Sequence, residues 1–324
     1  MEIVGTKHIN MNRKQKLITI LGPTATGKTR IATRLAYELG GEILSADSRQ
    51  VYRRMDIGTG KDLEDYTYNG TQIPYHLIDI EDPGKEYNLF KFQQAAHAAI
   101  DEIRKKGKPI IMCGGSGMYI EAIVKGYKLF PVPENPQLKA ELDNTPEEKL
   151  IQMLASYRPL HNHTDTCEHN RLVHAIILEK YYAEHPELQE ISTAHPSLLF
   201  GIKGERDLIR NRITLRLKER LENGMIEEVK SLIDSGVDPQ QLIRYGLEYK
   251  FITLYIQNEI SYDFMFEKLN IAIHQFSKRQ MTWFRKMERE GFEINWLDVA
   301  WAVRRKAERT LYRNIRTDSN SCAH

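Results

Sequence analysis

Short apolar runs alternate with amphipathic stretches through the first 130 residues of the chain. The apolar runs have the length of buried strands and lie at residues 17–21, 42–46, 75–80 and 109–113. Apolar positions with helical spacing follow three of these runs, at residues 29–39, after the capping residue Asn88, and at residues 118–125. Strands that alternate with helices predict an α/β domain built on a parallel sheet.

The pattern changes after residue 130, where a proline-rich connector opens a polar and all-helical stretch. Strand character returns at residues 198–203, and the remainder is helical, with a break at Gly224 and a helix expected over residues 242–257. We therefore expect an α/β core with C-terminal helices at 17–130 and 198–297, a helical insertion at 131–197, an N-terminal tail at 1–16, and a basic C-terminal helix and tail at 298–324.

Composition limits the class of protein. The 324 residues are 41% hydrophobic and 28% charged, which is typical of a soluble globular protein, and the net charge is only +2. The three cysteines lie far apart in the sequence, which favours a reducing cytoplasm over a disulfide framework. No apolar run reaches the roughly 18 residues of a membrane span, and the N-terminus lacks the apolar core of a signal peptide. We expect a cytoplasmic monomer that does not bind membranes.

The first strand leads into the sequence G-x-x-x-x-G-K-T at residues 22–29. The members of this motif are Gly22, Pro23, Thr24, Ala25, Thr26, Gly27, Lys28 and Thr29. Its glycines let backbone N–H groups wrap around an anion, the following helix presents its positive N-terminus, and the lysine adds a full charge. The Thr29 hydroxyl is a candidate ligand for Mg²⁺. The motif predicts a phosphate site in a P-loop NTPase-like sheet, but not whose phosphates it binds.

Polar residues follow the other strands at the edge of the sheet where parallel α/β proteins bind ligands. Asp47 comes directly after the second strand, where it can serve as a catalytic carboxylate or as a helix cap. Asp79, near the end of the third strand, resembles the acidic residue that often supports Mg²⁺ beside a phosphate loop. The fourth strand ends in a glycine-rich turn at residues 114–117, which directs N–H groups at the same edge.

Two further clusters carry cationic or metal-binding groups. Arg212, Arg216 and Arg220 form one row along a helix, which suits phosphate oxygens but is also compatible with a solvated face paired with acids. Histidines surround Cys167 in the insertion, which suggests zinc, but their spacing matches no standard ligand pattern. A solvated, hydrogen-bonding helix entry is the simpler interpretation of this cluster, whose histidines are His161, His163, His169 and His174.

These motifs, in this order, resemble the tRNA dimethylallyltransferase family, also called tRNA isopentenyltransferases. A generic phosphate-loop protein shares only the first of them, and ADSRQVY directly downstream of that loop is highly specific. The resemblance is carried by GPTATGKT at 22–29, SADSRQVYRRMDIGTGK at 45–61, HLIDIEDP at 76–83, GGSGMY at 114–119, RNRITLR at 210–216, RYGLEYK at 244–250 and KRQMTWFRK at 278–286.

The resemblance implies transfer of a dimethylallyl group from dimethylallyl diphosphate to N6 of the adenosine 3′ of the anticodon in tRNA, with release of pyrophosphate. It implies that the loop binds this diphosphate and that Lys28, Arg216 and Mg²⁺ on Thr29 stabilise the leaving group. Asp47 matches the general base that takes a proton from the amine. The target adenine would be splayed out of the RNA loop to meet residues that include Asp47, Ser48, Arg49, Gln50 and Ser116, the last a threonine in most of the family.

The insertion would then be an arm that grips the anticodon stem-loop, with Lys139, Asn170 and Arg171 as RNA contacts. The family's arm usually carries a second arginine where this chain has His174. The last third of the chain interleaves cations with aromatic residues such as Trp283 and Phe284, a pattern suited to RNA binding but also to core packing.

Three alternatives remain open. An ATP-dependent small-molecule kinase shares the loop, but it needs an adenine pocket and a lid rich in paired arginines, of which residues 131–197 offer little. Isopentenyl transfer to free adenine nucleotides leaves the helical arm and the basic C-terminus unexplained. A non-catalytic RNA-binding protein has no need of Lys28 and Asp47 together.

Overall fold

The computed structural model describes residues 17–160, 169–190 and 193–299. The chain divides into a large unit, which extends up to Lys125 and resumes at His195, and a small unit, Gly126–Ala194. The tail predicted at 1–16 lies outside the described residues. So does the segment predicted at 298–324, except for its first two residues.

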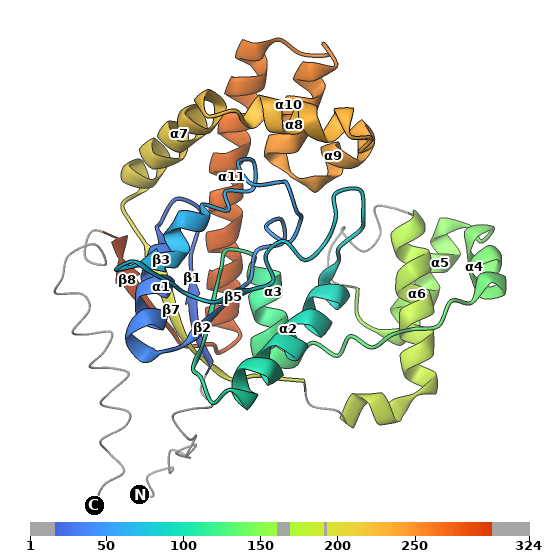
Figure 1. Ribbon diagram of the computed structural model, residues 1–324. Helices are drawn as coiled ribbons and strands as arrows, with labels where there is room; N and C mark the ends of the chain where they lie inside the picture. The colour runs from blue at the N-terminus through green and yellow to red at the C-terminus, as the bar shows by residue number, and fades with distance from the viewer. Residues whose placement is uncertain (1–16, 161–168, 191–192, 300–324) are drawn as a thin grey trace, which may run out of the picture. The chain divides into compact units, whose positions relative to one another are not determined.

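A six-stranded parallel sheet forms the centre of the large unit, in the order β5-β2-β6-β1-β7-β8 (Figure 1). β1 lies between β6 and β7, so that Ile20 faces Cys113 on one side and Phe200 on the other. Every residue of β1 is buried, as expected of a strand covered on both faces. The strands are β1 Leu17–Leu21, β2 Glu42–Ser45, β5 Tyr75–His76, β6 Ile110–Gly114, β7 Ser197–Lys203 and β8 Ile294–Asp298, and a separate hairpin pairs β3 Thr67–Tyr68 with β4 Thr71–Gln72.

Helices cover both faces of this sheet because alternate strand residues point to opposite sides. Ile18 and Ile20 pack with α1 (Lys28–Leu39) on one face. Leu17 and Leu21 pack on the other face with α2 (Leu89–Lys105), α3 (Gly117–Glu121) and the C-terminal part of α11 (Tyr262–Arg289). The prediction of a P-loop NTPase-like α/β core is confirmed. The carboxyl ends of the neighbouring strands β1, β2 and β6 therefore meet at one edge.

The C-terminal helices form a second core within the large unit, and α11 runs from these helices down to the sheet (Figure 1). This core also contains Tyr52 and Met55, which hold the segment after β2 against the helices. The expectation of a single helix over residues 242–257 is wrong, because Gly246 adopts an extended backbone that separates two helices. The helices of this core besides α11 are α7 Arg206–Glu222, α8 Met225–Asp234, α9 Pro239–Tyr245 and α10 Leu247–Ile256.

The third predicted strand is shorter than residues 75–80, because Leu77 (φ 64°) and Asp79 (φ 55°) turn the chain out of strand geometry. The Asp79 carboxylate accepts a hydrogen bond from Lys61 Nζ, which also contacts Asp56 at 2.7 Å and lies 1% exposed. Asp79 is thus the partner of a buried lysine and does not line the cavity beside the phosphate loop. The expectation that it supports a metal ion there is wrong.

The small unit is helical, and its core contains Leu150 and Leu154 of one helix and Leu172 and Ile176 of another. Its first residue, Gly126, lies a few positions before the predicted start at 131, and its last residue, Ala194, lies a few positions before the predicted end at 197. Its elements are α4 Pro136–Asp143, α5 Glu147–Tyr157, α6 His169–Glu184 and a 3₁₀ turn at Pro186–Glu190, while the π-helical turn Ala122–Gly126 lies at its N-terminal boundary. Within the described ranges of the whole chain, none of the helices has the length and apolar character to cross a membrane.

Candidate functional site

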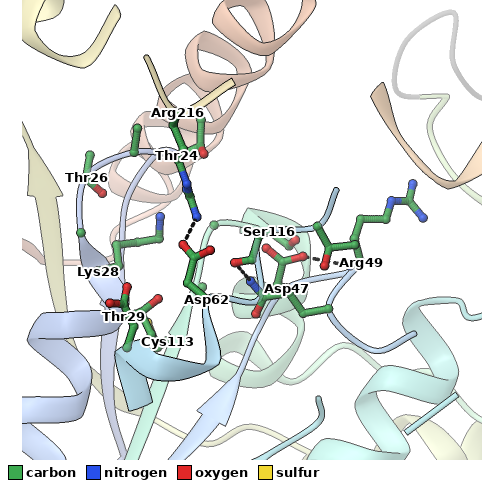
Figure 2. A pocket seen from close by; sticks show the side chains of 18 of the residues that line it. Thr24, Thr26, Lys28, Thr29, Asp47, Arg49, Asp62, Cys113, Ser116 and Arg216 are labelled. Carbon is green, nitrogen blue, oxygen red and sulfur yellow. Dashed lines mark hydrogen bonds and ion pairs between the residues drawn. The ribbon is translucent and has the colours of Figure 1, made fainter. Parts of the chain in front are cut away.

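The carboxyl ends of β1, β2 and β6 open into a cavity of about 1210 Å³ in the large unit. The phosphate loop, the segment after β2, the glycine-rich turn after β6 and helices α7, α10 and α11 supply its walls. Figure 2 shows residues from several of these elements around one space, with Lys28 and Thr29 on the phosphate loop and Asp47 beside Ser116.

The phosphate loop is held in shape by its own contacts. Gly22 has no room for a side chain, since a Cβ there would lie 2.5 Å from the Ile202 carbonyl oxygen. The Thr26 hydroxyl donates to the Pro23 carbonyl at 2.9 Å, and Lys28 Nζ donates to the same oxygen at 2.7 Å. Residues 24–29 line the cavity, whereas Gly22 and Pro23 shape the loop without lining it.

Lys28 is the principal cation of the loop, and its environment disfavours the charge. Burial lowers the pKa of Lys28 to about 8, although the negative charge of the neighbouring Asp47 acts in the opposite direction. Burial raises the pKa of the Cys113 thiol to about 12, so this group is neutral beside the lysine. A buried ammonium group is stabilised by a bound anion, which is what a phosphate site requires.

Asp47 lies just beyond β2, and hydrogen bonds tie its segment to the turn after β6. Asp47 Oδ1 accepts the Arg49 N–H at 2.9 Å, and the Ser48 N–H donates to Ser116 Oγ at 3.1 Å. The Gln50 side chain donates to the Gly60 carbonyl at 3.1 Å. Asp47, Ser48, Arg49, Gln50 and Ser116, all predicted from the sequence, line the same cavity as the phosphate loop.

The predicted arginine row also faces this cavity, since Arg212, Arg216 and Arg220 of α7 all line it. Arg216 donates to the Asp62 carboxylate, as the dashed line in Figure 2 shows. Arg220 lies so close to Gly60 that a Cβ at Gly60 would be 1.7 Å from Arg220 Nη2. Burial is the main cause that lowers the pKa of Arg220 to about 10, and the positive charge of Arg216 acts in the same direction.

The residues predicted to contact RNA from the insertion all belong to the small unit. Lys139 pairs with Asp143 at 2.5 Å on α4, and Asn170 and Arg171 lie in the first turn of α6. In the histidine-rich segment, residues 161–168 lie outside the described residues, and His169 Nε2 lies 3.1 Å from the Asp143 carbonyl oxygen. The described residues contain no group of three or more His, Cys, Asp or Glu side chains placed to hold a metal ion.

Three residues of the site were not predicted from the sequence. Asp62 binds Arg216, and Glu248 of α10 lines the cavity beside Arg220, where burial raises the pKa of its carboxyl group. Gln280 of α11 accepts the Thr24 N–H at 2.9 Å. The sequence pointed to these three residues only through their location, because they lie within or next to the motif segments 45–61, 244–250 and 278–286.

Comparisons with known proteins identify the family. A family model described as IPP transferase matches residues 50–287. The tRNA dimethylallyltransferase 2 of Phocaeicola vulgatus is 54% identical over 299 residues, which cover 92% of this chain and 97% of that protein. The crystal structure of the full-length tRNA isopentenylpyrophosphate transferase from Bacillus halodurans is 28% identical, has a TM-score of 0.67, and is matched over 96% of this chain and 100% of that chain.

A more distant solved structure shares the fold. It is a eukaryotic dimethylallyltransferase acting on tRNA, 20% identical with a TM-score of 0.73, matched over 94% of this chain and 80% of that chain. The family model spans most of the sequence, and the Phocaeicola relative is aligned over nearly its whole length. The chain therefore belongs to the tRNA dimethylallyltransferase family of transferases.

Proposed function

We propose that this protein transfers a dimethylallyl group from dimethylallyl diphosphate to N6 of the adenosine 3′ of the anticodon in tRNA and releases pyrophosphate. The observation that carries the proposal is a single cavity lined by both an anion-binding loop with Lys28 and the carboxylate Asp47. The names of the relatives, a tRNA dimethylallyltransferase and a tRNA isopentenylpyrophosphate transferase, support the same reaction.

The loop would bind the diphosphate through the backbone N–H groups that follow Thr24 and through Lys28. The Thr24 N–H is already engaged by Gln280 Oε1 at 2.9 Å, so the N–H groups from Ala25 onward would form the cradle. Negative charge grows on the leaving pyrophosphate as its carbon–oxygen bond breaks, and fixed donors aimed at that charge lower the barrier. Arg216 supplies a further guanidinium to the lining of the same cavity.

The loop also fits a magnesium ion. Mg²⁺ keeps several waters and takes few protein ligands besides substrate phosphates. The Thr29 hydroxyl on the cavity wall would be one ligand, and waters and diphosphate oxygens would supply others. When bound, the ion would neutralise charge on the diphosphate oxygens.

Asp47 would act on the other substrate. The exocyclic amine attacks the allylic carbon, the new C–N bond replaces the C–O bond to the diphosphate, and one N–H proton must leave. Asp47 Oδ1 accepts the Arg49 N–H, which leaves its other oxygen to accept that proton. Ser48, Arg49, Gln50 and Ser116 would form the wall that meets the extruded adenosine.

The small unit would supply the RNA contacts Lys139, Asn170 and Arg171. Cations and amide groups at these positions suit the phosphate and sugar groups of an RNA stem. We also propose that the protein acts as a cytoplasmic monomer.

Labelled dimethylallyl diphosphate incubated with unmodified tRNA and Mg²⁺ tests this proposal. We expect label in N6-(dimethylallyl)adenosine at the position 3′ of the anticodon, and loss of transfer in Lys28→Ala. Parallel reactions contain free adenine nucleotides as acceptors or ATP with labelled γ-phosphate as donor. Label only in free nucleotides, or phosphate transfer from ATP to a small molecule, would contradict the proposal.

A further inference from the structure

We infer that Gln280 is a positioning residue that holds the phosphate loop and the glycine-rich turn after β6 at one separation. The inference rests on the proposed function, because it assigns Gln280 to the alignment of the two substrates. Gln280 belongs to the KRQMTWFRK segment, which the mechanism above leaves without a role.

The amide of Gln280 makes one hydrogen bond to each of the two loops. Its Oε1 accepts the Thr24 N–H of the phosphate loop at 2.9 Å, and its Nε2 donates to the Gly115 carbonyl at 2.9 Å. Gln280 is 8% exposed; its bond to Gly115 is buried, and its bond to Thr24 is partly buried. Gly115 leaves the necessary space, since a Cβ there would lie 2.4 Å from Gln280 Nε2.

The same contacts continue from Gly115 to the proposed general base. Ser116 follows Gly115 and accepts the Ser48 N–H at 3.1 Å, and Asp47 immediately precedes Ser48. A side-chain path from the diphosphate loop to the carboxylate therefore passes through the amide of Gln280, in addition to the backbone pairing of β1 with β6 and of β6 with β2. A small misplacement of reacting groups costs rate even where each substrate still binds.

The phosphate loop does not need Gln280 to keep its own shape. The Thr26 hydroxyl and Lys28 Nζ both bond to the Pro23 carbonyl within the loop. The loss of the Gln280 amide should therefore disturb the separation of the two loops more than diphosphate binding. This difference separates a positioning role from a general contribution to stability.

Gln280→Met removes both hydrogen bonds but keeps the length of the side chain. We expect kcat for transfer to fall on the order of 10- to 100-fold, with the KM for dimethylallyl diphosphate changed by less than about threefold. Gln93→Met is the matched control, because Gln93 is 2% exposed, donates to the Ala122 carbonyl at 3.2 Å and lies outside the cavity. We expect Gln93→Met to reduce stability while kcat remains within about twofold of the wild type.

Gln280→Glu provides a second test. A carboxylate keeps the acceptor for the Thr24 N–H, but it can donate to the Gly115 carbonyl only when protonated. We expect the rate of this variant relative to the wild type to rise as the pH falls from about 8 to about 6, since burial favours the protonated acid. A constant or falling ratio would overturn the inference.

Hydrogen exchange at the Thr24 amide tests the contact independently of activity. We expect slow exchange in the wild type and in Gln93→Met, and faster exchange in Gln280→Met. If the wild type transfers no dimethylallyl group, the proposed function fails, while this exchange pattern still supports the tie between the loops. A wild-type kcat in Gln280→Met, unchanged Thr24 exchange, or a loss confined to the KM for tRNA would overturn the inference.

Discussion

The Arg216 guanidinium on α7 donates a hydrogen bond to the Asp62 carboxylate on the wall of the cavity (Figure 2). The two side chains are 32% and 50% exposed, so water screens their attraction. Such exposed pairs contribute only about 0–1 kcal/mol to stability. A diphosphate in the neighbouring loop can therefore compete with Asp62 for Arg216, and the carboxylate opposes binding of the anion.

Asp62→Asn should therefore strengthen binding of inorganic pyrophosphate by about two- to fivefold, because it removes a competing negative charge. Isothermal titration calorimetry at low salt measures this affinity. Asp82→Asn is the control, because Asp82 pairs with Arg53 at 2.7 Å and lies outside the cavity. Weaker pyrophosphate binding in Asp62→Asn would show instead that Asp62 orients Arg216 for the anion.

Binding of a diphosphate should take up protons at alkaline pH. Burial lowers the pKa of Lys28 to about 8 in the free protein, and a bound anion favours the charged lysine. We expect proton uptake on pyrophosphate binding to grow as the pH rises through about 8, as measured by calorimetry in buffers of different ionisation enthalpy. The Lys28→Met variant has no titrating group there and should show no such rise; equal uptake in both proteins would exclude Lys28.

Acid should destabilise the protein through Glu42, the buried first residue of β2, which contacts His76, Lys106 and Lys108. Burial raises the pKa of Glu42, but the hydrogen bonds of Lys108, His76 and Lys106 outweigh it and lower the pKa to about 2. Because the folded-state pKa lies below the ordinary glutamate value of 4.5, this stability is present above pH 4.5 and is lost as the pH falls toward 2.

We expect the free energy of unfolding to fall by about 2 kcal/mol from this group between pH 5 and pH 3. Urea unfolding at each pH measures the change. Glu42→Gln should be less stable than the wild type at pH 7, yet should show a shallower decline over the same acid range. Parallel declines in the two proteins would remove Glu42 as the cause.

The residues of contiguous motifs were the predictable part of this protein. The phosphate loop, Asp47 and Ser116 each follow a strand, and the parallel sheet brings these strand ends together. The core interpretation of the aromatic residues in α11 is confirmed for Phe284, which is fully buried. Trp283 is half-buried and donates to the buried Glu121 carboxylate at 2.7 Å.

Contacts between distant segments were not predictable in the same way. Thr24 and Gln280 lie 256 positions apart, and Asp62 and Arg216 lie 154 positions apart. Single-sequence periodicity reports which face of an element is apolar, but not which polar groups meet across a cavity. The edge strand β8 was missed because INWLD mixes polar and apolar residues and is only partly buried.

The central claim is that Asp47 takes a proton from the adenosine amine of tRNA while dimethylallyl diphosphate is bound in the neighbouring phosphate loop. Asp47→Asn tests it most directly, because an asparagine oxygen can still accept the Arg49 N–H that orients this segment. The measurement is the single-turnover rate of dimethylallyl transfer to tRNA with both substrates saturating. We predict a rate on the order of 10²- to 10⁴-fold below the wild type, with the affinities for tRNA and pyrophosphate retained. A wild-type rate in Asp47→Asn would contradict the account.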